Sequence, residues 1–202
     1  MAIRHGASAL GLVSAMPSGP GPIPEDLIAE IVAQVPPTIA TFLLTSRQDA
    51  ASIIDQQRRT RVNTLQLVDT LATHELNTLR HALPGVRLVQ VIHVEGPESL
   101  EEAKAVAPHV DAILLDSGRP KATVKEFGGT GRVHDWSVSV RIRETVPVPI
   151  FLAGGLKPEN VREAIKQIGP FGVDVCTGVR TNGSLDETKL SAFFRAVRSA
   201  KP

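Results

Sequence analysis

Short apolar runs alternate with longer amphipathic segments along most of the chain. The apolar runs predict strands at residues 9–13, 38–44, 64–68, 87–94, 112–116, 149–153 and 173–176. The amphipathic segments predict helices at residues 24–35, 49–60, 74–83, 99–107, 134–144, 158–168 and 186–199. Parallel neighbouring strands need a crossover, for which a helix is the usual solution, so this alternation predicts a parallel sheet covered by helices.

The last two apolar runs end in small residues. Gly154 and Gly155 follow the first of them, and Thr177 and Gly178 follow the second. Because glycine has no side chain, backbone N–H groups at these positions can approach an anion closely. We expect these four residues to bind a phosphate group, although glycines that only form tight turns are the alternative.

The seven predicted strands are compatible with two sheet topologies. An open doubly wound sheet is one of them. Glycine, acid or histidine at so many strand ends favours the other, a closed ring whose top face carries the functional side chains. A (β/α)8 barrel requires eight strands, one more than the pattern supplies.

Composition narrows the class of protein. The chain has 202 residues, of which 42% are hydrophobic, which suits one globular domain spanning residues 1–202. A net charge of +1, with six Phe, one Trp and no Tyr, argues against nucleic-acid binding. The single cysteine excludes an internal disulfide, and no signal peptide or membrane span is recognisable, so we expect a soluble cytoplasmic protein without a membrane partner. The six histidines show no metal-ligand spacing, and we expect no metal site and no cofactor.

Four ordered motifs carry a resemblance to a known family. They are Leu-Leu-Asp at 114–116, Gly-Gly-Thr-Gly at 128–131 followed by Asp135 and Trp136, Leu-Ala-Gly-Gly-Leu at 152–156 with Pro-Glu-Asn-Val at 158–161, and Gly-Val-Asp-Val-Cys-Thr-Gly-Val at 172–179. In this order and spacing the chain resembles phosphoribosylanthranilate isomerase. The resemblance implies a (β/α)8 TIM-barrel fold and a cofactor-free step of tryptophan biosynthesis on a phosphosugar.

The resemblance also implies a reaction. It is the Amadori rearrangement of N-(5-phosphoribosyl)anthranilate to 1-(2-carboxyphenylamino)-1-deoxyribulose 5-phosphate. In the family an aspartic acid protonates the furanose oxygen, and a cysteine on the first strand removes the C2 proton. The acid corresponds to Asp116, whereas the first strand, its cysteine and most of the first helix have no counterpart in this chain. The alternatives are a catalytically silent phosphosugar-binding barrel and, less favoured, another phosphosugar enzyme on the same fold.

Asp116 also has a physical rationale of its own. It ends the apolar run at 112–116, where barrel side chains point into the active-site mouth and burial can raise a carboxyl pKa. An ordinary turn contact after the strand is the alternative. Cys176 is the only thiol and therefore a possible base, but a small buried side chain is the interpretation we favour.

The resemblance suggests further substrate contacts. It places Asp174 and Gln66 in the pocket, and Gly129 in a loop that closes over the substrate or merely connects two elements. Arg180 is our hypothesis for recognition of the anthranilate carboxylate, since guanidinium pairs well with carboxylate, with a surface ion pair as the alternative. For His93 we favour a structural role, and we expect Asp135 and Trp136 to begin the next helix.

A seven-stranded barrel would leave two unpaired edges, at strands 9–13 and 173–176. Exposed edges invite pairing or aggregation. We expect the gap to be covered by an N-terminal segment, by a rearranged segment or by a partner chain, a homo-oligomer being one form of the last.

Overall fold

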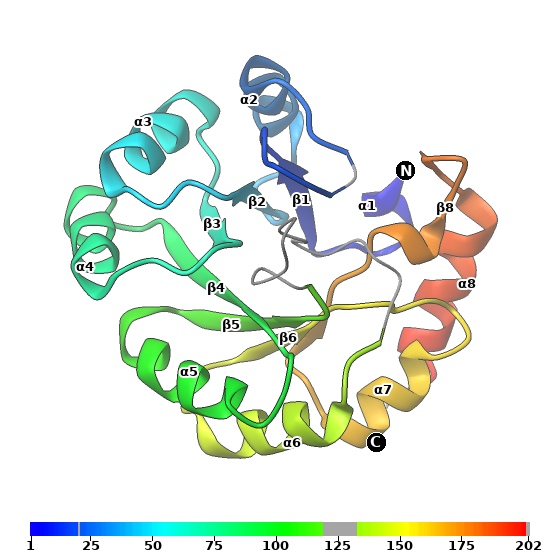
Figure 1. Cartoon of the computed structure of the whole chain (residues 1–202). Helices are drawn as coiled ribbons and strands as arrows, with labels where there is room; N and C mark the ends of the chain where they lie inside the picture. Colours follow the sequence, from blue (N-terminus) through cyan, green and yellow to red (C-terminus); the bar gives the residue numbers. More distant parts are fainter. Residues whose placement is uncertain (20, 119–132, 201–202) are drawn as a thin grey trace.

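The strands of the computed structural model form a curled parallel sheet whose helices lie on the outside (Figure 1). The structure describes residues 1–19, 21–118 and 133–200. The strands of the main sheet are β1 (Ala9–Val13), β2 (Ala40–Thr45), β3 (Thr64–Leu67), β4 (Arg87–His93), β5 (Ala112–Asp116), β6 (Ile150–Leu152) and β7 (Gly172–Val173). They are hydrogen-bonded in sequence order, each parallel to the next. This order has no reversal point, which excludes the doubly wound alternative and confirms the barrel-type fold.

The helices of the outer layer follow the strands in turn. They are α2 (Glu25–Gln34), α3 (Ala50–Thr60), α4 (Thr73–Ala82), α5 (Ser99–Val106), α6 (Trp136–Thr145), α7 (Val161–Ile168) and α8 (Glu187–Arg198), with a short α1 (Ala2–His5) before β1. Asp49, Asp135 and Asp186 each accept backbone N–H groups of the first turn that follows, which fixes the starts of α3, α6 and α8. The prediction that Asp135 and Trp136 begin a helix is confirmed.

Alternation along the strands divides the core into two layers. Leu65, Leu88 and Ile113 belong to a large cluster between the strands and the helices. Val89 and Leu114 belong to a smaller cluster inside the ring. Because successive side chains point to opposite faces, the residues of β5 that share the phase of Leu114, including Asp116, point inward.

The end of the sheet corrects the sequence prediction. The strand predicted at 173–176 is only Gly172–Val173, because its neighbour β6 ends at Leu152, the last residue paired with Val173. The chain then forms a 3-10 helix, η2 (Thr177–Val179), and a hairpin of β8 (Arg180–Thr181) and β9 (Ser184–Leu185). The hairpin was not predicted, because its strands of two residues are too short for a periodic pattern.

The strands β1 and β7 form the two ends of the sheet. On β1, Ala9 and Gly11 are exposed. On the outer side of this gap α1 packs on α8, and His5 Nε2 lies 3.1 Å from Glu187 Oε1. Over the described ranges, none of the helices has the length and apolar character needed to span a membrane.

Candidate active site

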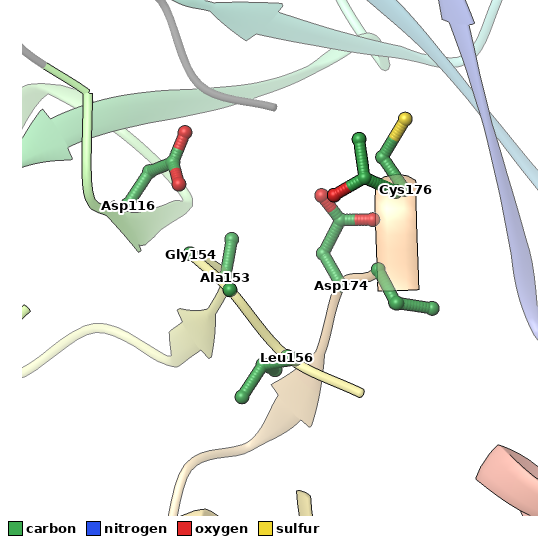
Figure 2. Close-up of a pocket in the computed structure, with 9 residues that line it drawn as sticks. Asp116, Ala153, Gly154, Leu156, Asp174 and Cys176 are labelled. Carbon is green, nitrogen blue, oxygen red and sulfur yellow. The ribbon is translucent and has the colours of Figure 1, made fainter. Parts of the chain in front are cut away.

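The ends of β5, β6 and β7 enclose a pocket at the carboxyl edge of the sheet (Figure 2). Its lining consists of Asp116, Ala153, Gly154, Gly155, Leu156, Asp174, Val175, Cys176 and Thr177. Parallel strands bring their carboxyl ends to one edge, which is why residues as far apart in the sequence as Asp116 and Thr177 meet here. Five of the predicted site residues therefore share one pocket.

The other predicted site residues lie elsewhere. Gly178 directly follows Thr177 in η2. Gln66 is buried within β3, beside Leu44 and Val89 in the sheet register and away from the pocket lining. Gly129 lies outside the described residues, as does the rest of its glycine-rich loop.

Asp116 is the last residue of β5 and is only 8% exposed. Its Oδ1 accepts a hydrogen bond of 2.7 Å from the backbone N of Ser117. Burial raises the pKa of Asp116, while the Ser117 bond and the charge of His93 act in the opposite direction. The Ser117 contact is the turn contact expected of a strand-end aspartate, but the buried position also holds a carboxylic acid where it can donate a proton.

Asp174 faces the same pocket from the segment after β7. Figure 2 shows its carboxyl group on the other side of Ala153 from that of Asp116. Desolvation by the surrounding protein atoms, together with the charge of Asp116, raises the pKa of Asp174 to about 6. A hydrogen bond from the backbone of Val175 acts in the opposite direction and lowers this pKa. The side chain remains exposed to the open cavity, and solvent there moderates this desolvation.

His93 is a neighbour of Asp116 that the sequence interpretation underestimated. The two residues are directly paired in the register of β4 and β5. His93 Nε2 lies 2.9 Å from the carbonyl oxygen of Val68, which can only accept, so Nε2 carries a proton. The contact with Val68 holds the ring in place, and the ring also contributes to the electrostatics of Asp116.

Cys176 and Arg180 form a second pair at the pocket wall. Burial raises the pKa of the Cys176 thiol, as do the charges of Asp174 and Asp116, while Arg180 opposes the shift by its charge and a hydrogen bond. Arg180 also donates from Nη1 to the carbonyl oxygen of Gly183 at 2.8 Å. The guanidinium of Arg180 lies beside Cys176, and among the described residues it forms no ion pair with an acidic side chain.

Gly154 of the pocket lining and Gly178, which follows the lining residue Thr177, have no room for a side chain. A Cβ at Gly154 would lie 2.9 Å from the backbone N of Ser117, and Gly154 also has a φ of +82°. A Cβ at Gly178 would lie 1.9 Å from the carbonyl oxygen of Leu156. Glycine is thus required for the close approach of the loops that follow β5, β6 and β7.

A metal centre has no obvious ligands in this part of the chain. Across the ranges that the structure describes, no three His, Cys, Asp or Glu side chains are grouped so that they could hold a metal ion.

Comparison with known proteins identifies the family. Residues 7–196 match the family model described as N-(5'phosphoribosyl)anthranilate (PRA) isomerase. The chain belongs to the phosphoribosylanthranilate isomerase family. A relative, N-(5'-phosphoribosyl)anthranilate isomerase 2 of Methanosarcina mazei, is 36% identical over 98% of this chain and 88% of its own length.

Solved structures of phosphoribosylanthranilate isomerases share the fold. The Thermotoga maritima enzyme superposes with a TM-score of 0.84 at 26% identity, over 98% of this chain and 91% of that one. Another, at 24% identity and a TM-score of 0.81 over 98% and 91%, was solved in complex with reduced 1-(o-carboxyphenylamino)-1-deoxyribulose 5-phosphate. The family resemblance of the sequence is confirmed by all three comparisons.

Proposed function

We propose that this chain catalyses the isomerisation of N-(5-phosphoribosyl)anthranilate to 1-(2-carboxyphenylamino)-1-deoxyribulose 5-phosphate in tryptophan biosynthesis. The observation that carries the proposal is Asp116, a buried carboxyl with a raised pKa that faces the family's pocket. A carboxyl whose pKa is raised by burial is suited to general acid catalysis, because it keeps its proton to a higher pH than an exposed aspartate does. The identity of the substrate is inferred from the family to which the chain belongs.

Asp116 would act first. Its carboxylic acid donates a proton to the furanose ring oxygen while the bond from that oxygen to C1 breaks, and the anilino nitrogen forms the C1 iminium. Removal of the C2 proton then gives an enolamine, which tautomerises to the ketone. The low-exposure environment of Asp116 favours the protonated form that the first step requires.

The two ends of the substrate would be held by different groups. We propose that the phosphate lies against the backbone of Gly154, Gly155, Thr177 and Gly178, whose close loops leave N–H groups free of side-chain obstruction. For the anthranilate carboxylate we propose Arg180, because it lies beside Cys176 of the pocket without an acidic partner among the described residues. Gln66 and Gly129 remain predicted substrate contacts.

The proposal is tested by an isomerase assay of the purified 202-residue chain, with product separated from substrate by chromatography. We expect turnover by the wild-type chain and a loss of about 10²- to 10⁴-fold in Asp116→Asn, the range attributable to general acid catalysis. Asp49→Asn is the matched control: Asp49 caps α3 away from the pocket, and asparagine also caps helices well.

The outcomes separate the competing functions. Turnover that survives in Asp116→Asn contradicts the acid role. Binding of the reduced product analogue without any wild-type turnover supports the silent phosphosugar-binding protein instead. An Arg180→Ala variant with an unchanged KM, compared with Lys166→Ala as a control for loss of an exposed cation on α7, contradicts the carboxylate assignment.

We also propose that a second copy of the chain covers the gap between β1 and β7. The support is physical: Ala9 and Gly11 of the end strand are exposed, and Phe171, just before β7, is 73% exposed. Unpaired strand edges with exposed apolar neighbours favour association.

A further inference from the structure

The loop after β6 contains two consecutive glycines in the left-handed conformation. Gly154 has a φ of +82° and Gly155 a φ of +64°. Glycine loses more conformational freedom on folding than any other residue, so a loop of this kind needs contacts from other groups to keep a single conformation. In the described part of the chain, Asn160 makes such contacts.

The side chain of Asn160 forms hydrogen bonds with this loop at two points. Its Nδ2 donates to the carbonyl oxygen of Gly155 at 3.0 Å, and its Oδ1 accepts the backbone N–H of Lys157 at 2.8 Å. One of these bonds is made to the peptide group before Leu156, and the other to the peptide group after it. Asn160 therefore fixes the backbone of Leu156 from both sides.

Asn160 is also the residue directly before α7, where an asparagine usually caps its own helix. Such a cap requires the side-chain oxygen to accept an N–H group of the first turn. The side chain of Asn160 makes no such bond, and its backbone already has a helical ψ of −17°. Both polar groups of this side chain are bonded to the loop instead, so its contribution is to the loop rather than to the start of α7.

The two peptide groups that Asn160 holds are trans. In a trans peptide the C=O and the N–H point in opposite directions, so the N–H and the C=O of Leu156 both point away from Asn160. The N–H of Leu156 donates to no acceptor on another described residue. Leu156 lines the pocket although its side chain is packed in the core (Figure 2), which leaves its backbone as the part that can meet a ligand.

The pocket lining offers a bound phosphate no cationic side chain. None of its nine described residues is Lys or Arg, and two of them, Asp116 and Asp174, are acidic. Phosphate binding therefore depends on oriented backbone N–H groups, which act as fixed partial positive charges. Donors of this kind are effective only when the loop that carries them is held in one orientation.

We propose that Asn160 is a positioning residue for phosphate binding, which turns the N–H of Leu156 toward the phosphate. This inference rests on the proposed isomerase function and adds to it a residue outside the pocket lining. The loop after β7 depends on the same contact, since a Cβ at Gly178 would lie 1.9 Å from the carbonyl oxygen of Leu156. By fixing Leu156, Asn160 aligns both loops of the proposed phosphate site.

The test measures binding of the reduced product analogue, with and without its 5-phosphate, by calorimetry. Asn160→Ser is the decisive variant, because serine caps helices well but is too short to reach both Gly155 and Lys157. We expect it to bind the phosphorylated analogue about tenfold more weakly than the wild-type chain, the worth of one hydrogen bond. Its affinity for the analogue without phosphate should change by less than about twofold, and this binding also shows that the variant folds.

Steady-state kinetics give an independent measurement. KM of Asn160→Ser should rise by about tenfold, while kcat stays close to the wild-type value because the proposed acid is unchanged. Asn63→Ala is the matched control: Asn63 Oδ1 also accepts a backbone N–H, that of Thr41 at 2.9 Å, but at the opposite edge of the sheet. This control should be less stable in urea and should keep the wild-type KM.

The contrary outcomes can be told apart. Equal losses of affinity for the two forms of the analogue would overturn the proposal, because Asn160 would then support the pocket as a whole. Unchanged affinity in Asn160→Ser would overturn it as well, since the loop would keep its conformation without the bridge. A wild-type chain that prefers the phosphorylated form but shows no turnover contradicts the isomerase function and leaves the role of Asn160 in place.

Discussion

At the scale of single residues, the burial of Asp116 that suits the proposed acid role also destabilises the folded protein when the carboxyl group is ionised. Its raised pKa means that the folded protein binds a proton more tightly than the unfolded chain does. Its contribution to stability is therefore complete below the unfolded pKa and is lost as pH rises through the folded pKa. A buried carboxylate at neutral pH destabilises the fold that holds it.

Asp116→Asn should therefore raise the free energy of unfolding at pH 7 to 8, while abolishing the proposed acid. The asparagine can still accept the hydrogen bond from Ser117, so the backbone contact is kept. Urea denaturation at several pH values measures the effect. The difference between variant and wild type should shrink as pH falls, because the wild-type carboxyl then takes up a proton itself. A difference that does not change with pH would contradict the explanation.

Gly178 allows a second prediction at this scale. Its Cβ would meet the rigid backbone of Leu156, whereas a Cβ at Gly96 would meet only the flexible carboxylate end of Glu98. We expect Gly178→Ala to lower the free energy of unfolding by about 1–3 kcal/mol, the usual cost of overpacking, and Gly96→Ala to have little effect. Equal denaturation midpoints for the two variants would show that the loops can move apart without cost.

Strand-end residues were predictable because a parallel sheet delivers its carboxyl ends to one edge. Asp116, Asp174 and the glycines of the pocket followed from that rule and from the family motifs. His93 was undervalued because its pairing with Asp116 depends on the register of β4 and β5, which no local pattern reveals. Arg180 approaches the pocket through a hairpin too short to be predicted.

At the scale of elements, Asp111 joins three of them at the opposite edge of the sheet. It accepts the backbone N of Leu88 in β4 at 2.8 Å, Arg87 at 3.0 Å and Arg80 of α4 at 2.8 Å. Burial would raise the pKa of Asp111, but the Leu88 bond and the two arginines lower it overall. Stability from this carboxylate is therefore present above its unfolded pKa and is lost as pH falls through the folded one.

Asp111→Ala should lower the free energy of unfolding by about 1–3 kcal/mol, because the N–H of buried Leu88 loses its partner. Asp111→Asn keeps an oxygen for Leu88 and loses the charge, so its loss should be smaller. Chemical denaturation at pH 7 compares the two. A larger loss for asparagine than for alanine would show that the N–H of Leu88 is not the dominant contribution.

Helix starts were predicted to within two residues, except for α7, which begins at Val161 rather than at 158. Aspartate caps mark the starts of α3, α6 and α8 in the sequence. The end of β7 was predicted wrongly, because the length of β7 depends on where its neighbour β6 ends. The turn at Gly154 and Gly155 removes the hydrogen-bonding partner, and the apolar pattern of 173–176 continues beyond the ladder. Local sequence predicts what an element can be, whereas its neighbour decides how far it extends.

At the scale of the whole molecule, the ring is open between β1 and β7 although the helices α1 and α8 meet outside it. The count of seven strands predicted this opening, but it did not predict which side chains lie beside the opening. Phe171 extends a row of edge-to-face aromatic contacts, with ring centroids 5.6 Å apart to Phe151, and Phe151 in turn lies 6.2 Å from Phe42. Such an exposed ring beside an unpaired edge is a suitable anchor for a second copy.

The wild-type chain should accordingly sediment as a dimer or larger species whose population rises with concentration. Phe171→Asp should shift it toward the monomer, because a charge on an apolar contact surface opposes association. Val133→Asp is the matched control, because Val133 is another exposed apolar side chain and precedes α6, which packs on α5 and α7 rather than beside β1, and it should leave the equilibrium unchanged. Analytical ultracentrifugation of the three proteins measures the association. A wild-type chain that is monomeric at every concentration would contradict the proposal, because the open edges of β1 and β7 would then be stable without a second copy. Equal effects of the two substitutions would place the contact surface away from Phe171.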